Sequence, residues 1–179
     1  SIIVDEMKQA DSLVSGEIMV DGLTNVLAEP EFAGSEDARR ALSLMAARFY
    51  GRPLERLLNI GVTGTNGTTS VAWLAAQLLS RLGTKTSLVG TLGLAFLSGD
   101  DREGESTFAK TPNTTPGPLE IHQFVCCCPG VQALVAEVTS QGLVQQRMCG
   151  IDWDAAIFTN LTRDHLDLHG TLENYEAIK

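Results

Sequence analysis

A glycine-rich segment, Gly61-Val-Thr-Gly-Thr-Asn-Gly-Thr-Thr-Ser70, has the residue types that can hold a phosphate group. Its glycines at 64 and 67 let the backbone turn tightly, so that successive N–H groups can point at phosphate oxygens. The segment leads into a predicted helix, whose N-terminus adds a partial positive charge. A hydroxyl at Thr69 stands where phosphate loops ligate Mg²⁺. The candidate nucleotide-binding residues are Gly64, Thr65, Asn66, Gly67, Thr68, Thr69 and Ser70.

Position 68 departs from the usual phosphate-loop pattern, because threonine stands where a lysine normally neutralises the β- and γ-phosphates. Losing one charge-assisted contact costs about 1.5–3 kcal/mol. If that contact tightens in a transition state, the rate falls by about 10²–10³. No other basic residue near the loop in the sequence is an obvious substitute. We therefore expect the loop to be impaired.

Polar side chains also follow three later apolar runs. Asn113, Thr114 and Thr115 form one group, and Glu137 ends a strongly apolar run as a carboxylate that could ligate Mg²⁺. Beyond it stand Thr139, Gln145 and Arg147, and the Arg147 guanidinium can bind two oxygens of a carboxylate or pyrophosphate. Residues 145 and 147 would not share a face of a regular helix, so a local turn must aim both inward. The third group contains His165 and His169, of which His169 is expected to be structural.

These side chains need a scaffold of alternating strands and helices. Helices are predicted at about 35–49, 68–82, after 118, 141–148 and 171–179, and strands at 1–4, 57–63, 86–89, 131–138 and 155–158. Segment 90–110 is predicted to be a hairpin or a long loop. Apolar strands separated by helices indicate an α/β fold with a mostly parallel sheet flanked by helices. Ligands of such sheets bind at the carboxyl ends of the strands, where each motif lies.

Composition narrows the classes of partner. The chain has 179 residues, 44% of them hydrophobic and 20% charged, and a formal net charge of −9 without any run of Lys or Arg. We therefore expect a globular protein without a nucleic-acid partner. No apolar stretch approaches the roughly 20 residues of a membrane span, and no signal sequence is recognisable. Cysteines 126–128 and 149 do not have zinc or disulfide-framework spacing, which favours reduced thiols and a cytoplasmic location.

Taken together, the motifs resemble those of the Mur ligases, most closely the UDP-N-acetylmuramoyl-tripeptide synthetase branch. The family loop T-G-T-N-G-K-T corresponds here to Thr63-Gly-Thr-Asn-Gly-Thr-Thr69. Asn113-Thr-Thr-Pro116 is similar to the segment that holds the muramoyl-peptide. Glu137-Val-Thr-Ser-Gln-Gly-Leu-Val-Gln-Gln-Arg147 is similar to E-V-S-S-H-G-L-V-Q-x-R, and Phe158-Thr-Asn-Leu-Thr-Arg-Asp-His-Leu-Asp-Leu-His-Gly170 is similar to T-N-L-x-x-D-H-L-D-x-H-G.

The resemblance implies that residues 53–179 form an incomplete, P-loop-like central ATP-binding domain. Residues 1–52 would be a remnant of a UDP-binding domain together with a linker helix, and the C-terminal ligase domain would be absent. It implies a monomer that uses ATP, Mg²⁺, a UDP-MurNAc-peptide and an amino acid in peptidoglycan synthesis. ATP would convert a peptide carboxylate into an acyl phosphate. The amino group would then attack the acyl carbon, and the intermediate would expel phosphate to leave an amide.

The resemblance also implies residue roles. Thr69, Glu137 and His165 would ligate magnesium, and Lys179 occupies the position of a lysine that many family members carry as a carbamate. The six residues expected to hold the muramoyl-peptide are Asn113, Thr114, Thr115, Thr139, Gln145 and Arg147. Two alternatives stay open: a non-catalytic nucleotide- or muropeptide-binding module of the same descent, favoured by Thr68, and a folylpolyglutamate synthase-like ligase.

Overall fold

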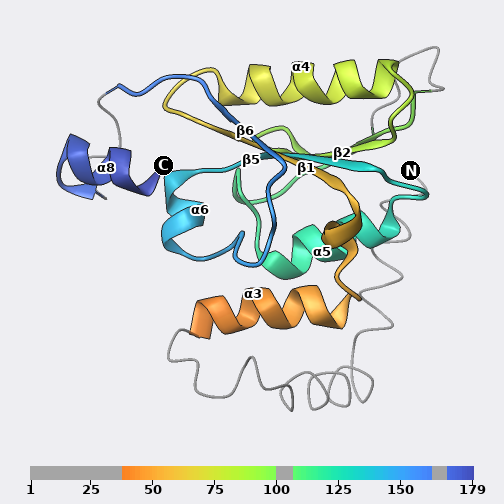
Figure 1. The fold of residues 1–179 in the computed structure, drawn as a ribbon, viewed down its shortest axis with the longest axis horizontal. Coiled ribbons are helices and arrows are strands. Elements are labelled where there is room, and N and C mark those ends of the chain that lie inside the picture. Colours follow the sequence, from red (N-terminus) through yellow and green to blue (C-terminus); the bar gives the residue numbers. More distant parts are fainter. Residues whose placement is uncertain (1–37, 100–106, 163–168) are drawn as a thin grey trace.

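The computed structural model describes residues 38–99, 107–162 and 169–179 of the chain. The helices are α3 (Ala38–Phe49), α4 (Thr68–Arg81), α5 (Pro118–Cys127), α6 (Ser140–Val144) and α8 (Leu172–Ile178), with a 3-10 turn η2 at Pro53–Arg56. The strands are β1 (Leu58–Thr63), β2 (Thr86–Gly90), β3 (Gly93–Leu97), β4 (Thr107–Ala109), β5 (Ala133–Glu137) and β6 (Ala155–Phe158). Figure 1 shows how they are arranged.

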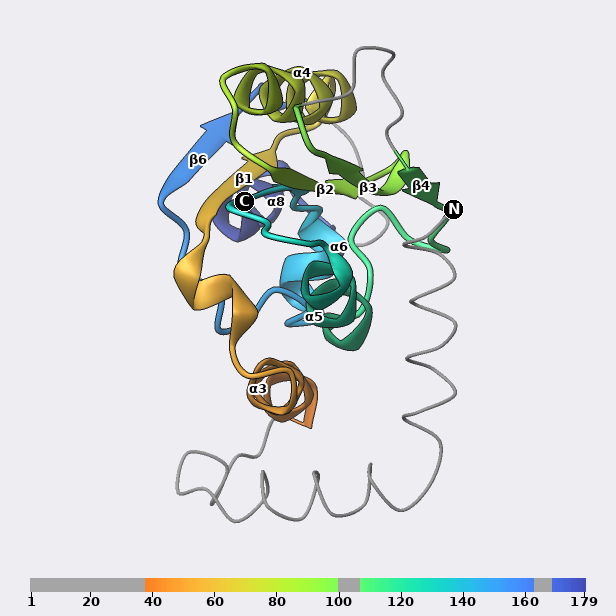
Figure 2. The same ribbon diagram turned by 90° about the vertical axis from the view of Figure 1, so that its right-hand side faces the viewer.

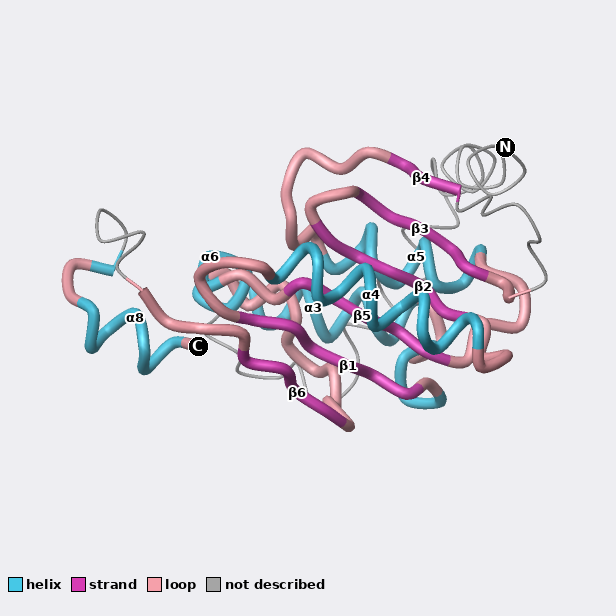
Figure 3. The backbone as a smooth tube through the Cα atoms, turned by 90° about the horizontal axis from the view of Figure 1, so that it is seen from above, coloured by secondary structure: helices cyan, strands magenta, loops and turns pink. Residues whose placement is uncertain are grey.

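The strands form one sheet in the order β4-β3-β2-β5-β1-β6 (Figure 3). Strands β2, β5, β1 and β6 are parallel, whereas β3 and β4 extend the sheet in antiparallel pairs. The register pairs Val62 with Glu137 and Thr63 with Phe158, so the carboxyl ends of β1, β5 and β6 lie at one edge. Because parallel sheets bind ligands at this edge, it is the first place to look for a site.

Helices cover both faces of the sheet. Figure 2 shows α4 on one face and α5 on the other, with α3 packed beneath α5. Neighbouring residues of β2 point to opposite faces: Leu88 packs in the cluster with Ala72 of α4, and Val89 packs in the cluster with Phe124 of α5. This burial on both faces explains why the central strands are apolar without alternation.

The predicted α/β class with a mostly parallel sheet is confirmed, and most element positions agree to within a few residues. Segment 90–110 contains a hairpin in which β3 pairs with β2, followed by β4. The helix predicted at 141–148 is shorter than expected, because α6 ends at Val144. The strand predicted at 1–4 lies outside the described residues. Among the described helices, none has the length and apolarity that crossing a bilayer requires.

Candidate nucleotide, metal and substrate sites

The glycine-rich loop joins β1 to α4 at the carboxyl edge of the sheet. Gly67 is the N-cap of α4 with a φ of 82°, a left-handed conformation that glycine adopts readily. It has no side chain, so the N-cap residue itself does not occupy the N–H groups of the first turn. A 14-residue helix therefore presents its N-terminus at this loop.

The segment that follows β6 braces the loop. The Thr65 N–H donates to the Asn160 carbonyl oxygen at 2.9 Å, and the Asn66 N–H donates to Asn160 Oδ1 at 3.0 Å. The Thr159 hydroxyl and the Asn160 amide both donate to the Asn66 carbonyl oxygen. At Gly64, with a φ of 143°, a Cβ would collide with the Thr159 hydroxyl. The conformation of the loop is thus held by partners almost 100 residues away in sequence.

Glu137 ends β5 beside this loop and is only 3% exposed. Its Oε2 atom accepts hydrogen bonds from three threonine hydroxyls, those of Thr68 at 3.2 Å, Thr69 at 3.0 Å and Thr91 at 3.1 Å. Its Oε1 atom accepts the backbone N–H of Thr91 at 2.8 Å. All of these donors are neutral. They satisfy the oxygen lone pairs of the carboxylate but do not offset its charge.

This oxygen set fits a magnesium ion. Mg²⁺ prefers hard oxygen ligands, and two adjacent ligands of an octahedral ion at about 2.1 Å lie about 3 Å apart. The Thr69 hydroxyl and Glu137 Oε2 are 3.0 Å apart. A buried carboxylate among neutral donors is also a place where a cation is favourable. His165, the third expected ligand, lies outside the described residues.

Lys179 reaches the same loop. Its Nζ donates to the Gly64 carbonyl oxygen and, at 3.2 Å, to the Thr63 hydroxyl. The ammonium also lies 5.2 Å from the centre of the Tyr175 ring, within the range of a cation–π contact. The expectation that no basic residue substitutes for a loop lysine therefore needs correcting. A lysine 111 positions after Thr68 in sequence brings a positive charge to the loop.

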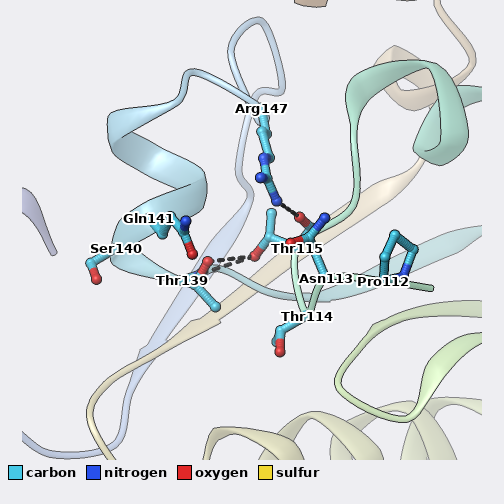
Figure 4. A pocket seen from close by; sticks show the side chains of 8 residues that line it. All are labelled: Pro112, Asn113, Thr114, Thr115, Thr139, Ser140, Gln141 and Arg147. Carbon is cyan, nitrogen blue, oxygen red and sulfur yellow. Dashed lines mark hydrogen bonds between the residues drawn. The ribbon is translucent and has the colours of Figure 1, made fainter. Parts of the chain in front are cut away.

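A second site lies beside the first, as a pocket of about 310 Å³. Figure 4 shows its lining: Pro112, Asn113, Thr114, Thr115, Thr139, Ser140, Gln141 and Arg147. Arg147 donates to the Thr115 carbonyl oxygen and holds the segment before α5 against the turn that follows α6. The hydroxyls of Thr115 and Thr139 are 3.0 Å apart, and the Thr115 hydroxyl also donates to the Glu137 carbonyl oxygen. The pocket is thus built on the end of the same strand as the Glu137 carboxylate.

The predicted turn between Gln145 and Arg147 is present. Gln146 has a φ of 57°, one of the few positive values among the described non-glycine residues. This left-handed residue follows the end of α6 and lets the Arg147 guanidinium donate to Gln145 Oε1. The two side chains meet although a regular helix would separate them. Gln145 lies outside the lining of the 310 Å³ pocket but lines a neighbouring one that shares Arg147.

Comparison with known proteins identifies the family. The family model of the Mur ligase middle domain matches residues 62–179, which include the loop, Glu137 and the pocket. The chain belongs to the Mur ligase family. The match covers about two thirds of the chain and begins inside β1.

Among its relatives is the UDP-N-acetylmuramoyl-L-alanyl-D-glutamate--2,6-diaminopimelate ligase of Syntrophomonas wolfei subsp. wolfei. The two chains are 38% identical in an alignment of 188 positions, gaps included, that covers 99% of this chain and 37% of the relative. The ligase of the same name from Ectopseudomonas mendocina is 46% identical over 140 residues, or 77% of this chain and 27% of the relative. A solved structure of a ligase of this name is 32% identical with a TM-score of 0.66, over 80% of this chain and 28% of that one. The chain thus spans about a third of the length of these Mur ligases.

Within this Mur ligase fold, the structure brings most of the predicted residues to the carboxyl ends of the parallel strands, whereas Ser70 is exposed on α4. His169 is buried, with its Nε2 at 2.9 Å from the Ser140 hydroxyl and its ring against Tyr175, as a structural histidine should be. The sequence motifs did not single out Thr91. A threonine immediately after a buried strand, in Gly90-Thr91, was the available signal.

Proposed function

We propose that this chain forms the nucleotide-binding part of an ATP-dependent ligase that joins an amino acid to a UDP-MurNAc-dipeptide in peptidoglycan synthesis. The observation that carries the proposal is the buried Glu137 carboxylate, 3.0 Å from the Thr69 hydroxyl at a glycine-rich loop. The names of the relatives support 2,6-diaminopimelate as the amino acid and UDP-N-acetylmuramoyl-L-alanyl-D-glutamate as its acceptor. ATP and Mg²⁺ are the cofactors that this chemistry requires.

In this proposal the residues of the loop bind and orient the triphosphate of ATP. The N–H groups at the start of α4 would face the phosphate oxygens, and Thr69 and Glu137 would hold Mg²⁺, which offsets the charge that develops on the phosphates. Thr68 contributes a hydroxyl that donates to Glu137 at 3.2 Å, and it contributes no positive charge. Position 68 therefore supplies no cation of its own, and Lys179, whose Nζ donates to the Gly64 carbonyl oxygen, brings a positive charge to the loop from another part of the chain.

The 310 Å³ pocket would hold the muramoyl-dipeptide. Asn113, Thr114 and Thr139 present polar side chains there, and Arg147 is the cation beside them. A D-glutamate carboxylate matches the guanidinium in charge and shape. Because Thr115 also donates to the Glu137 carbonyl oxygen at 2.8 Å, the pocket and the carboxylate are fixed to each other. This arrangement would place the acceptor carboxylate near the γ-phosphate, as transfer requires.

Lys179 has two possible roles at the loop, and they have opposite charges. As an amine it brings positive charge to Gly64, where the triphosphate would lie. As a carbamate, the form implied by family resemblance, it would bring negative charge to the metal. Carbon-13 NMR with labelled bicarbonate separates the two, since only the carbamate gives a bicarbonate-dependent carbonyl signal. Mg–ATP binding that needs no bicarbonate would support the amine.

Titration calorimetry with Mg–ATP tests the proposed binding site directly. Glu137→Gln keeps the shape of the side chain and removes its charge, so Mg–ATP affinity should fall by about 10–100-fold. Glu173→Gln is the matched control, because it removes an exposed carboxylate on α8. Equal affinities in the parent and in Glu137→Gln would contradict the proposed site.

Turnover is tested in a complete three-domain ligase. Residues 62–179 would replace the matching segment of the Syntrophomonas relative, with threonine or lysine at position 68. Thr68→Lys should raise ATP-dependent ligation at least tenfold, since a charge-assisted contact of about 1.5–3 kcal/mol is restored. Equal rates would show that the loop does not depend on this charge.

A second candidate is a module that binds nucleotide or muropeptide without catalysis. The observation in its favour is the neutral loop itself, in which Thr68 donates to Glu137 at 3.2 Å. Three results together would support this candidate. The chain binds Mg–ATP in calorimetry, the chimera with threonine at 68 shows no ligation, and the chimera with lysine at 68 recovers it.

A further inference from the structure

Thr91 lies between the two sites and contacts both. It follows the buried strand β2, and its N–H donates to Glu137 Oε1 at 2.8 Å. Its hydroxyl is 3.1 Å from Glu137 Oε2 and also 3.1 Å from the Thr114 hydroxyl in the neighbouring pocket. One side chain therefore links the carboxylate beside the phosphate loop to the segment proposed to hold the muramoyl-dipeptide.

The charge on Glu137 sets the direction of these hydrogen bonds. An ionised carboxylate only accepts, so the single hydroxyl proton of Thr91 must point at Glu137. The Thr91 oxygen can then only accept from Thr114, and the Thr114 proton is directed away from the pocket. In this state the Thr114 hydroxyl can accept from a ligand in the pocket but cannot donate to it.

Binding of a cation at Glu137 would change this arrangement. Oε2 already accepts from three hydroxyls, those of Thr68, Thr69 and Thr91, and a carboxylate oxygen has about two lone-pair positions. A cation that takes one of them and also binds the Thr69 hydroxyl oxygen leaves a single position, for which the hydroxyls of Thr68 and Thr91 compete. Of these two, the Thr91 hydroxyl has a second partner to turn to, the Thr114 hydroxyl at 3.1 Å. Once Thr91 is released, its proton can be donated to Thr114 instead, and the Thr114 proton becomes available to an acceptor such as a carboxylate in the pocket.

We propose that Thr91 is a positioning residue through which Mg–nucleotide binding at Glu137 strengthens the binding of a carboxylate-bearing ligand at Thr114. This inference rests on the proposed function, because it takes the two sites as those for Mg–ATP and for the muramoyl-dipeptide. The coupling is positive, and by linkage each ligand strengthens the other by the same factor.

Calorimetry of the 179-residue chain tests the coupling without turnover. UDP-N-acetylmuramoyl-L-alanyl-D-glutamate would be titrated with and without a saturating Mg complex of a non-hydrolysable ATP analogue. In the parent chain the Mg–nucleotide should tighten this binding by about tenfold, within the usual range for coupled sites. Thr91→Val keeps the side-chain shape and the backbone N–H but lacks the hydroxyl, so the tightening should fall below about twofold.

Two further variants exclude a general structural effect. Thr91→Ser restores the hydroxyl and should restore the tenfold tightening, whereas Thr114→Val should remove the tightening as completely as Thr91→Val does. In the double variant the loss should be no larger than in either single one. Coupling that persists in a folded Thr91→Val chain, or a parent that binds both ligands independently, overturns the inference and leaves the proposed function intact. A parent that binds neither ligand overturns both.

Discussion

Gly90 offers a way to disturb the Glu137 carboxylate without changing any polar residue. This glycine is the last residue of β2, is buried, and lies next to the Glu137 side chain of the neighbouring strand β5. A Cβ at Gly90 would collide with Glu137 Oε1 and lie 2.8 Å from Cδ and 2.9 Å from Cγ. All three atoms belong to the carboxylate end of one side chain. Gly90→Ala must therefore move this carboxylate, while the chemical groups at the site stay the same.

The size of the effect follows from the hydrogen bond nearest to the collision. Oε1 accepts the Thr91 N–H at 2.8 Å, and a displaced carboxylate loses this bond. A hydrogen bond to a charged group contributes about 1.5–3 kcal/mol. If that amount is lost from the geometry that binds Mg–ATP, the affinity falls by about 10–150-fold. Overpacking also costs about 1–3 kcal/mol of folding stability.

Two measurements separate these effects. Calorimetry gives the affinity for Mg–ATP, and urea denaturation gives the free energy of unfolding. Gly117→Ala is the matched control, because its Cβ would meet only Glu120 Oε2 at an ordinary 3.5 Å, far from the loop in sequence. A Gly90→Ala chain that is folded and binds Mg–ATP as tightly as the parent would refute the placement of the metal at Glu137.

Three further predictions concern the pocket and the core. Arg147→Lys should weaken binding of the muramoyl-dipeptide about tenfold in calorimetry, because lysine lacks the planar fork that donates to Thr115 and Gln145; an unchanged affinity would contradict it. Gly142→Ala should lower the free energy of unfolding in urea by about 1–3 kcal/mol, since its Cβ would lie 2.7 Å from Thr115 Cγ2, and full stability would show that the pocket wall can yield. Burial lowers the pKa of His122 from 6.5 to about 4. Between these pH values the unfolded chain binds a proton that the folded chain lacks, so the free energy of unfolding falls by about 3 kcal/mol in total as the pH falls from 6.5 to 4. In urea denaturation at several pH values, His122→Phe should remove most of this pH dependence. An unchanged pH dependence would assign it to other groups.

Much of this structure could be predicted from local sequence signals. The apolar runs that become β1 and β5 have few polar residues because both faces of the sheet are covered. The glycine at 67 indicated where α4 begins, since the chain there needs a left-handed residue without a capping side chain. The two-residue spacing of Gln145 and Arg147 required a turn, and the positive φ of Gln146 supplies it.

Other features depend on strand order and long-range packing, which local patterns do not encode. Thr91 becomes a partner of Glu137 only because β2 pairs in parallel with β5, a pairing between residues almost 50 positions apart. Lys179 reaches Gly64 because α8 packs on the loop, with the Tyr175 hydroxyl 3.4 Å from that of Thr65. Spacing alone cannot place a lysine beside a loop that lies 115 residues earlier.

The replacement of lysine by threonine at 68 changes the charge balance between the two halves of the site. A lysine there would offset charge on the nucleotide and lie close to Glu137, whereas Thr68 only adds a third hydroxyl at Oε2. The carboxylate keeps its full attraction for a divalent cation. The triphosphate loses the cation at position 68, and the positive charge that Lys179 brings lies at Gly64, on the loop backbone. This loop should therefore depend more on Mg²⁺ to bring the nucleotide in than a loop with its lysine does. Free ATP, which would face the Glu137 charge without a bridging cation, should bind far more weakly than Mg–ATP, and Thr68→Lys should narrow that difference.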